Sequence, residues 1–281
     1  MSAVPKPRRP VLRYHGSKWR LAPWVISHFP PHRVYVEPFG GGAGVLLRKP
    51  RVYAEVYNDL NSDVVSLFRI LRDPVQAEQL ARSLALTPFS RDEYELAHER
   101  TDDPLEAARR FVLVSFMGFS TCNCNFQERS GFRAKSYRSG TSPAWDWRKY
   151  PEALASIVDR LRGVSFENRD AFELIPAMDR HDMLFYCDPP YPRSTRVKYG
   201  AYEHEMDDDD HRRLSELLYQ IKGMAIISSY DSPLYRELYA DWHMVTTVAR
   251  TDGTDRVECL WLSPRTVSAN DRGLFSARNK T

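Results

Sequence analysis

The sequence has few of the features that mark secreted, disulfide-bonded or membrane-spanning proteins. It contains four cysteines in 281 residues, no apolar run of about 18 residues and no apolar signal-peptide segment at its N-terminus. Cys122, Cys124, Cys187 and Cys259 fit neither a disulfide framework nor a zinc site, because no nearby Cys or His completes a tetrahedron around the first two. We therefore expect a cytoplasmic protein with no metal ion and no membrane partner.

An excess of charge of one sign is absent as well. The 40 Lys and Arg residues barely outnumber the 37 Asp and Glu residues, so the formal net charge of +3 argues only weakly for nucleic acid as a partner. A hydrophobic content of 42% and a charged content of 27% are typical of a globular protein, and the length suffices for a full core domain with a smaller insert. Basic residues gather at both ends, so we expect solvated tails at residues 1–10 and 266–281.

The most informative stretch is Asp188-Pro189-Pro190-Tyr191, which follows an apolar run at residues 183–187. The run predicts a buried strand, and the two prolines end it abruptly because neither can donate to a sheet ladder. A carboxylate, a free carbonyl and an aromatic ring would then lie at the carboxyl end of the strand, where open α/β sheets bind their ligands. The alternative is a strand that ends in a Pro-Pro turn with a capping aspartate.

Methyl transfer to the exocyclic amine of a nucleobase is a reaction that needs these groups. Such an amine is a poor nucleophile because its lone pair is delocalised into the ring, so the site must favour the nitrogen that carries the developing positive charge. Asp188 can accept one amine hydrogen and the carbonyl of Pro189 the other, while Pro190 restricts the backbone that holds this carbonyl. Tyr191 would stack on a base swung out of the duplex. We therefore assign these four residues to catalysis.

A glycine-rich turn lies near the N-terminus of the chain. Residues 34–47 predict a short strand, the turn at residues 40–44 and an apolar helix, which together form the first βα unit of a Rossmann-like fold. The turn departs from the dinucleotide fingerprint because Glu37 and Pro38 precede it. The next predicted strand, at residues 52–58, ends at Asp59, where an acid can bind ribose hydroxyls. Turn and acid together favour an adenosine-containing ligand over a purely structural turn.

Residues 75–159 interrupt the alternation of strands and helices. Residues 75–117 have a helical apolar pattern, and residues 118–150 combine basic and aromatic side chains, which contact phosphates and bases respectively. We expect a helical nucleic-acid-binding insert, or alternatively an irregular loop whose aromatic residues pack against the helices. The basic candidates, in this insert and in the loop after Tyr191, are Arg129, Arg133, Lys135, Arg138, Arg193, Arg196 and Lys198.

The C-terminal half predicts the remainder of an α/β sheet. Strands are expected at residues 164–168 and 224–227, and the runs at 244–248 and 257–262 predict a terminal antiparallel hairpin. Asp170 follows the first of these strands, where it can accept from the exocyclic amine of a bound adenosine or cap the next helix. The predicted fold class is therefore α/β, with a mostly parallel sheet.

Together these motifs resemble the Dam-type family of DNA adenine-N6 methyltransferases, which use S-adenosylmethionine. The segment Tyr14-His-Gly-Ser-Lys18 is similar to the first motif of the family, residues 37–44 to its cofactor loop, and residues 188–191 to its catalytic motif. The resemblance implies a Rossmann-like catalytic domain at residues 11–74 and 160–265, and a helical target-recognition domain at residues 75–159.

The resemblance also implies a set of cofactor-binding residues. Tyr14 and Lys18 would lie near the methionine end of the cofactor, and Asp59 would hold its ribose. The full implied set is Tyr14, Lys18, Glu37, Pro38, Phe39, Gly40, Gly42, Asp59, Asp170 and Asp188. Double-stranded DNA is the implied substrate, a bacterium or phage the implied source, and a cognate restriction endonuclease is an allowed partner.

Other functions fit part of the sequence. A cytosine-N4 DNA methyltransferase must also activate an exocyclic amine that is a poor nucleophile. The acidic first position of the tetrapeptide and the resemblance favour adenine. A protein-glutamine methyltransferase typically begins this motif with Asn, which also sets it apart, and an RNA methyltransferase is less favoured than a DNA methyltransferase. A small-molecule methyltransferase would leave the basic aromatic insert unexplained. A non-catalytic DNA-binding relic of the fold would have no need of an intact tetrapeptide and glycine turn.

Overall fold

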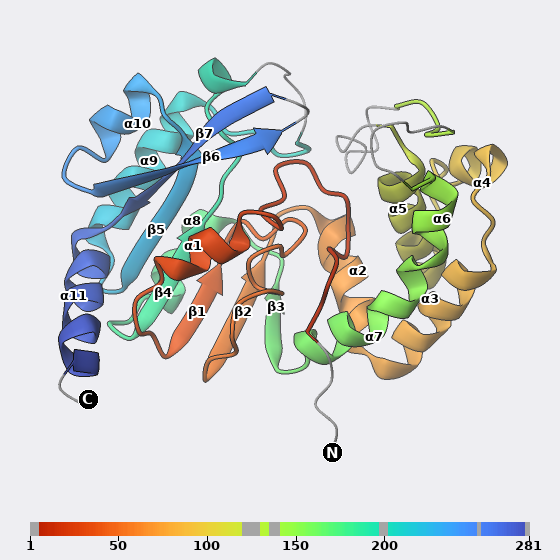
Figure 1. Cartoon of the computed structure of the whole chain (residues 1–281), viewed down its shortest axis with the longest axis horizontal. Coiled ribbons are helices and arrows are strands. Elements are labelled where there is room, and N and C mark those ends of the chain that lie inside the picture. Colours follow the sequence, from red (N-terminus) through yellow and green to blue (C-terminus); the bar gives the residue numbers. More distant parts are fainter. Residues whose placement is uncertain (1–5, 120–129, 135–140, 197–201, 252–253, 279–281) are drawn as a thin grey trace.

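The chain folds around a seven-stranded sheet, in a computed structural model that describes residues 6–119, 130–134, 141–196, 202–251 and 254–278. The strand order is β3-β2-β1-β4-β5-β7-β6 (Figure 1). The first five strands are parallel, whereas β7 runs antiparallel to both β5 and β6. The predicted mostly parallel sheet with a terminal antiparallel hairpin is confirmed. The strands are β1 Val34–Glu37, β2 Ala54–Asn58, β3 Val164–Glu167, β4 Met183–Cys187, β5 Met224–Tyr230, β6 His243–Thr251 and β7 Thr254–Leu262.

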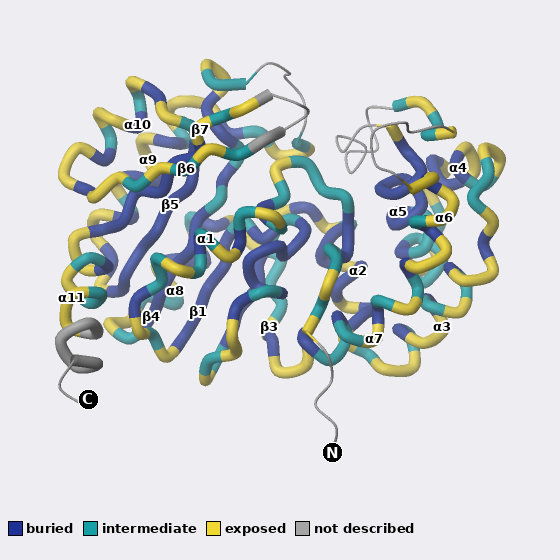
Figure 2. The backbone as a smooth tube through the Cα atoms, viewed as in Figure 1, coloured by how far each residue is buried: buried dark blue, intermediate teal, exposed yellow. Residues whose placement is uncertain are grey.

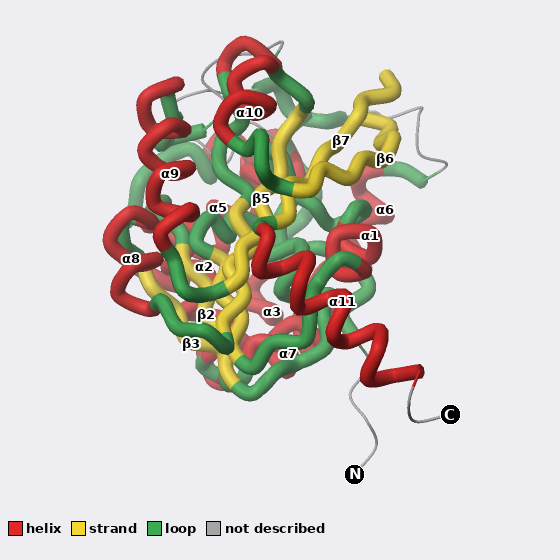
Figure 3. The backbone as a smooth tube through the Cα atoms, turned by 90° about the vertical axis from the view of Figure 1, so that its left-hand side faces the viewer, coloured by secondary structure: helices red, strands yellow, loops and turns green. Residues whose placement is uncertain are grey.

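Alternating side chains of the central strands fill two separate cores. In β4, Met183, Phe185 and Cys187 pack on one face of the sheet, while Leu184 and Tyr186 pack on the other. This is the period of two that a strand imposes, and every residue of β4 is buried because helices cover both faces (Figure 2). Seen edge-on, α8 Ala171–Met178, α9 Asp208–Gln220 and α10 Pro233–Leu238 lie on one side of the strands, and α1 Ala22–Ser27 and α11 Pro264–Arg278 on the other (Figure 3).

The predicted helical insert lies between β2 and β3. It packs beside α2 Ser62–Arg72, and its apolar residues belong to the same buried cluster as one face of the sheet. The predicted boundary at residues 159 and 160 falls inside its last helix. The helices of the insert are α3 Pro74–Leu86, α4 Arg91–Leu96, α5 Pro104–Met117, α6 Pro143–Arg148 and α7 Tyr150–Leu161.

A buried charge cluster ties the insert to the sheet. Glu55 on β2 is 3% exposed and lies 2.6 Å from Nζ of Lys49 and 2.6 Å from a guanidinium nitrogen of Arg160 on α7. Arg160 also donates to the carbonyl of Leu46 at 2.6 Å. Each charge has at least one partner of opposite sign, which is the condition for burying it.

The apolar helix predicted after the glycine turn is wrong. Residues 41–49 form turns, with two i to i−4 bonds, from Leu47 to Ala43 and from Lys49 to Val45. A helix needs consecutive i to i−4 bonds, but the Arg48 N–H between these two bonds to the carbonyl of Val45 at 3.1 Å. Pro50 has no N–H with which to continue the series, and Arg160 takes the carbonyl of Leu46.

The described parts of the two predicted tails contact the rest of the fold, although Lys6, Arg8, Asp271 and Arg272 are exposed as expected. The C-terminal segment forms α11, which begins at Pro264 and is held by the Thr266 hydroxyl donating to the carbonyl of Ala225 at 2.9 Å. Near the N-terminus, the Arg9 guanidinium lies over the rings of Phe116 and Tyr150, and it pairs with Asp146 at 3.2 Å. Sequence composition missed both, because a few specific contacts outweigh the polar character of these segments. Residues 1–5 and 279–281 lie outside the described chain.

We expect Arg160→Leu to destabilise the fold strongly. The change leaves Glu55 buried with Lys49 as its remaining cation and leaves the Leu46 carbonyl without its donor, so the free energy of unfolding should fall by about 3–5 kcal/mol. Urea unfolding followed by circular dichroism measures this loss. The control is Arg51→Ala, because Arg51 is 44% exposed where it bonds to the carbonyls of Asp159 and Arg162. Similar small losses in the two variants would contradict a bracing role for the buried cluster.

Candidate active site

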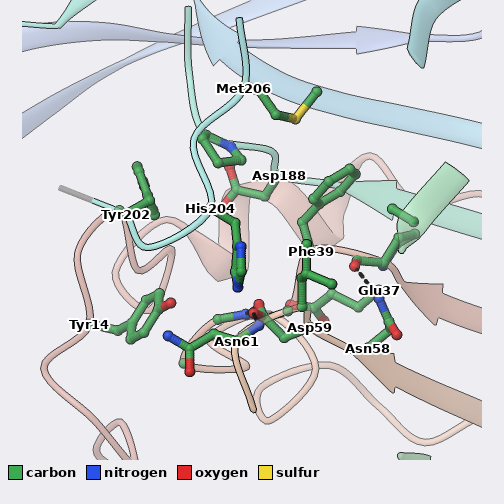
Figure 4. Close-up of a pocket in the computed structure, with 18 of the residues that line it drawn as sticks. Tyr14, Glu37, Phe39, Asn58, Asp59, Asn61, Asp188, Tyr202, His204 and Met206 are labelled. Atoms are coloured by element: carbon green, nitrogen blue, oxygen red, sulfur yellow. Dashed lines mark hydrogen bonds between the residues drawn. The ribbon is translucent and has the colours of Figure 1, made fainter. Parts of the chain in front are cut away.

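A cavity lies where the carboxyl ends of β1, β2, β3 and β4 meet. It contains about 1110 Å³ of empty space, part of it open to solvent. The strand order reverses between β1 and β4, and ligands of open α/β sheets bind at such a switch point. Its walls come from the glycine turn, from residues 14–18, 58–61, 169–172 and 202–206, and from Asp188 and Pro190 (Figure 4). The structure thus brings the three predicted sequence motifs to one place.

The glycine turn needs glycine because other side chains already fill the space beside it. A Cβ added at Gly40 would lie 2.2 Å from a ring carbon of Tyr57, and one at Gly41 would lie 2.9 Å from the ring of Tyr14. Gly41 also has a φ of +46°, which favours glycine. Glycine therefore lets the turn pack against these two rings while it lines the cavity.

Asp59 and Asn58 hold the glycine turn against the end of β2. Asp59 accepts the N–H of Gly41 at 2.7 Å and that of Asn61 at 2.8 Å. Burial raises the pKa of Asp59, although these two bonds oppose the shift. Asn58, which the sequence analysis did not single out, donates to the carbonyl of Pro38 at 2.8 Å (Figure 4). Asp59 lies on the cavity wall as predicted, and it also has a structural role there.

Glu37 lines the cavity, but one of its carboxylate oxygens accepts hydrogen bonds from other residues of the protein. Its Oε2 accepts the hydroxyl of Tyr35 at 2.9 Å and the N–H of Leu46 at 3.0 Å. The residue is 2% exposed, and burial raises its pKa to about 8, against the opposing effect of the Tyr35 bond. This bond to Leu46 also helps to keep residues 43–49 out of a regular helix.

Asp188 is held in place from two sides at the end of β4. Its Oδ1 accepts the hydroxyl of Ser228 on β5 at 2.6 Å and lies 2.9 Å from Nζ of Lys18. Lys18 also donates to the carbonyl of Gly16 at 3.0 Å. Burial alone would lower the pKa of Lys18, but Asp188 and Glu258 outweigh it and the pKa is raised. Lys18 therefore pairs with the predicted catalytic acid, a contact that the sequence did not indicate.

Tyr191 lies behind Asp188 and does not line the cavity. It is 6% exposed, and its hydroxyl donates to Oε2 of Glu258 on β7 at 2.9 Å. Nζ of Lys18 lies 4.6 Å from the centre of its ring, and the ring of Tyr230 meets it edge-on at 4.8 Å. We predicted a ring open to a base, whereas this structure buries the ring. Pro189 is buried too, and Pro190 lies on the cavity wall.

Residues 202–206 cover one side of the cavity, and the sequence analysis missed them. Asn61 donates to Glu203 at 2.8 Å, and the ring of Tyr202 meets that of His15 edge-on at 5.2 Å. The side chains of His204 and Met206 border the same cavity (Figure 4). These contacts join the loop after the catalytic motif to the N-terminal motif. Its polar sequence gave no signal for this, because the contacts bridge distant parts of the chain.

The remaining predicted residues have mixed outcomes. Asp170 caps α8 by accepting the N–H of Phe172 at 2.9 Å, which confirms the capping alternative, and it lines the cavity, where its contact with an adenosine amine stays a prediction. Arg193 is exposed, whereas Arg133 is half-buried, and burial lowers its pKa. Arg196 is 7% exposed and bonds to both carboxylate oxygens of Glu205, which does not suit the predicted contact with DNA. Four predicted DNA-binding residues lie outside the described chain: Arg129, Lys135, Arg138 and Lys198.

Metal and membrane sites are not seen in the described part of the chain. No group of three or more His, Cys, Asp or Glu side chains there is arranged to hold a metal ion. Cys187 and Cys259 are buried free thiols, while Cys122 and Cys124 lie outside the described residues. No described helix is both long and apolar enough to cross a membrane.

Comparison with known proteins gives one consistent family. Residues 14–252 match the family model described as D12 class N6 adenine-specific DNA methyltransferase. Among curated proteins, the DNA adenine methylase of Escherichia coli (strain K12) is 27% identical over 255 residues, covering 85% of this chain and 88% of its own. That of Serratia marcescens is 26% identical over 263 residues, covering 87% and 92%. That of Vibrio cholerae (strain O395) is 25% identical over 249 residues, covering 83% and 86%.

We expect Glu37→Gln to change how stability depends on pH. With a folded pKa of about 8 and an ordinary value of 4.5, Glu37 keeps its proton in the folded state where the unfolded chain has lost it. Its contribution to stability is therefore full below pH 4.5 and is lost as the pH rises toward 8. Glutamine keeps an acceptor for Tyr35 and Leu46 but cannot ionise.

Denaturation midpoints at intervals between about pH 5 and 8.5 measure this effect, because this range lies between and just above the unfolded and folded pKa values of Glu37. The difference between wild type and Glu37→Gln isolates this one group, because His211, whose pKa burial lowers to about 4, acts in the opposite direction in both proteins. Relative to wild type, the variant should gain stability steadily as the pH rises toward 8. A difference that stays constant with pH would show that Glu37 is ionised in the fold.

Proposed function

The chain belongs to the D12 class of N6 adenine-specific DNA methyltransferases, and we propose that it transfers a methyl group from S-adenosylmethionine to N6 of a flipped adenine in duplex DNA. The observation that carries the proposal is the position of Asp188. Its carboxylate lies on the wall of the cavity at the strand switch point, next to the glycine turn. Cytosine-N4 methylation and a non-catalytic relic have no observation in their favour.

The cavity fits S-adenosylmethionine in size and in chemistry. Its empty space is of the order that small-molecule sites contain, roughly 300–1,000 Å³ for enclosed ones. Gly40, Gly41 and Phe39 line the cavity, where Phe39 offers an apolar wall. Asp59 and Asp170 supply acceptors for hydroxyl and amine groups at the ends of β2 and β3. The negative charge of these acids also favours a cationic ligand.

The residues of the chain would act mainly by position and charge. When bound, S-adenosylmethionine supplies a methyl group whose carbon accepts the amine lone pair while the C–S electrons stay on sulfur, so positive charge passes to nitrogen and leaves with an amine proton. Asp188, fixed by Ser228 and Lys18, would accept a hydrogen bond from that amine and stabilise its growing charge. The Pro189 carbonyl would accept the second amine hydrogen. No covalent bond between enzyme and base is needed.

Duplex DNA would be bound by the insert and by the loops that border the cavity. The target adenine must leave the helical stack, because N6 cannot reach Asp188 from inside a duplex. Tyr191 would provide a stacking surface only after a rearrangement, since Lys18 now covers one face of its ring. The reaction does not require a cognate restriction endonuclease, because all groups assigned to it belong to this chain. We place the reaction in the bacterial cytoplasm, where the DNA lies.

Replacing the catalytic acid tests the proposed function directly. We expect plasmid DNA from a methylation-free host that expresses the wild-type chain to carry N6-methyladenine in one short sequence motif. The variant Asp188→Ala should leave no mark, because the amine loses its acceptor, while binding of S-adenosylmethionine changes little. Single-molecule sequencing identifies the base and the motif, and calorimetry measures binding. Full activity of the variant, or methylated cytosine in the wild-type sample, would overturn the assignment.

Gly40→Ala tests the proposed cofactor site. The new methyl group would lie within 2.2 Å of the Tyr57 ring, so the turn or the ring must move, and we expect the dissociation constant for S-adenosylmethionine to rise about tenfold or more. Calorimetric titration measures it. Gly131→Ala is the matched control, because a Cβ there meets nothing within 4 Å and Gly131 lies in the insert. Equal affinities in the two variants would argue against cofactor binding at this turn.

A further inference from the structure

A second buried carboxylate lies behind the catalytic motif, on the antiparallel part of the sheet. Glu258 belongs to β7, where it is paired with Tyr230 at the end of β5. It is 6% exposed, and its Oε2 accepts the hydroxyl of Tyr191 at 2.9 Å. The residue lies outside all three sequence motifs and does not line the cavity. Its carboxylate therefore reaches the site only through its neighbours.

Lys18 connects this carboxylate with Asp188. The Lys18 ammonium lies 2.9 Å from Oδ1 of Asp188 and 4.6 Å from the ring centre of Tyr191, the residue that Glu258 holds. The charges of Asp188 and Glu258 both stabilise this ammonium, which burial alone would disfavour. The charges of two carboxylates thus act on one buried cation, and Tyr191 contacts Lys18 with its ring and Glu258 with its hydroxyl.

This arrangement matters because methyl transfer brings positive charge close to a cation. As the new N–C bond forms, the amine nitrogen beside Asp188 becomes positive, and the nearby Lys18 ammonium opposes that change. The charge of Glu258, which also stabilises this ammonium, offsets the repulsion. Ser228 and Lys18 both bind Oδ1 of Asp188, and Oδ2 accepts no hydrogen bond from the described residues. Oδ2 is therefore available for the amine.

We propose that Glu258 is a positioning residue for methyl transfer, which fixes Tyr191 through its hydroxyl and offsets the charge of Lys18 so that Asp188 can stabilise the amine. The inference rests on the proposed function and adds to it a residue from the terminal hairpin. Because Glu258 acts through Lys18 and Tyr191, its loss should slow the chemical step and leave the binding of cofactor and DNA largely unchanged.

Two substitutions at Glu258 separate its two roles. Glu258→Gln keeps an acceptor for the Tyr191 hydroxyl but removes the charge, whereas Glu258→Ala removes both. The experiment measures single-turnover methyl transfer from tritiated S-adenosylmethionine to plasmid DNA at saturating concentrations, with dissociation constants from calorimetry. We expect Glu258→Gln to lower the rate by about tenfold and Glu258→Ala to lower it further. Binding of S-adenosylmethionine and the thermal midpoint of Glu258→Gln should stay close to wild type.

Tyr191→Phe provides a second, independent variant. It removes the hydroxyl and keeps both the ring and the charge of Glu258, so it should slow methyl transfer by several-fold. Added to Glu258→Ala, the same change should cost nothing more, because the bond between the two residues is already lost. Glu237→Gln is the matched control, since Glu237 on α10 is an exposed acid, 67% accessible, that pairs with Arg212 and does not line the cavity. Its rate should equal that of wild type.

The outcomes separate this inference from the function on which it rests. A wild-type chain that binds S-adenosylmethionine but methylates no DNA overturns both. An active wild type with Glu258→Gln and Glu258→Ala at wild-type rates overturns the inference alone. So does a loss of rate that is matched by an equal loss of cofactor affinity and thermal stability, because Glu258 would then only support the fold. A lower rate with unchanged binding, together with the non-additive Tyr191 pair, supports it.

Discussion

The site depends on one constraint of the sheet, the parallel pairing of β1 with both β2 and β4. Val34 is in register with Ala54 on one side and with Met183 on the other, so three strands end at the same edge. The glycine turn, Asp59 and Asp188 follow these three ends directly. Residues more than a hundred positions apart thus meet without any long loop. The helical insert between β2 and β3 can then add a large surface without disturbing the edge.

The same constraint crowds negative charge, and the fold handles each carboxylate differently. Glu37 is stabilised in its neutral form by burial and is bonded to Tyr35 and Leu46. Asp59 accepts two backbone N–H groups, which offset part of its burial. Asp188 pairs with Lys18. Because each acid is satisfied by a different kind of partner, the cavity can present acidic groups to a cationic ligand without strong repulsion between them.

Much of this fold could be predicted from the sequence because its strands are marked by local patterns, namely short apolar runs and the residues that end them. The run at residues 183–187 stops at two prolines, and the turn at residues 40–44 has an unusual density of glycine, so the strands that precede these two features were predicted and are confirmed. The family was predicted from the same motifs and is confirmed.

What the sequence could not supply depends on contacts between distant residues. In place of the helix predicted after the glycine turn there are turns, and Leu46 bonds there to Glu37 and Arg160, which a local sequence pattern does not connect to it. The segment that covers the cavity is held by the bond from Asn61 to Glu203, and these two residues are 142 positions apart in the sequence. Segments predicted as solvated tails are held by a few specific contacts, such as the bonds from Thr266 to Ala225 and from Asn270 to His28, and the cation–π contacts of Arg9. A pattern of hydrophobicity has no information on such contacts.

Glu258 escaped notice for a related reason, which concerns strand direction. Ligands of parallel sheets bind at the carboxyl ends of strands, so attention falls on residues that follow each apolar run. An antiparallel strand enters the sheet from the opposite side, and its first half is what lies at the ligand-binding edge. Glu258 stands before the buried half of β7 and pairs with the last residue of β5. In a sheet of this kind, the first half of the antiparallel strand is therefore also a place to look for residues that contact the site, as Glu258 contacts Tyr191.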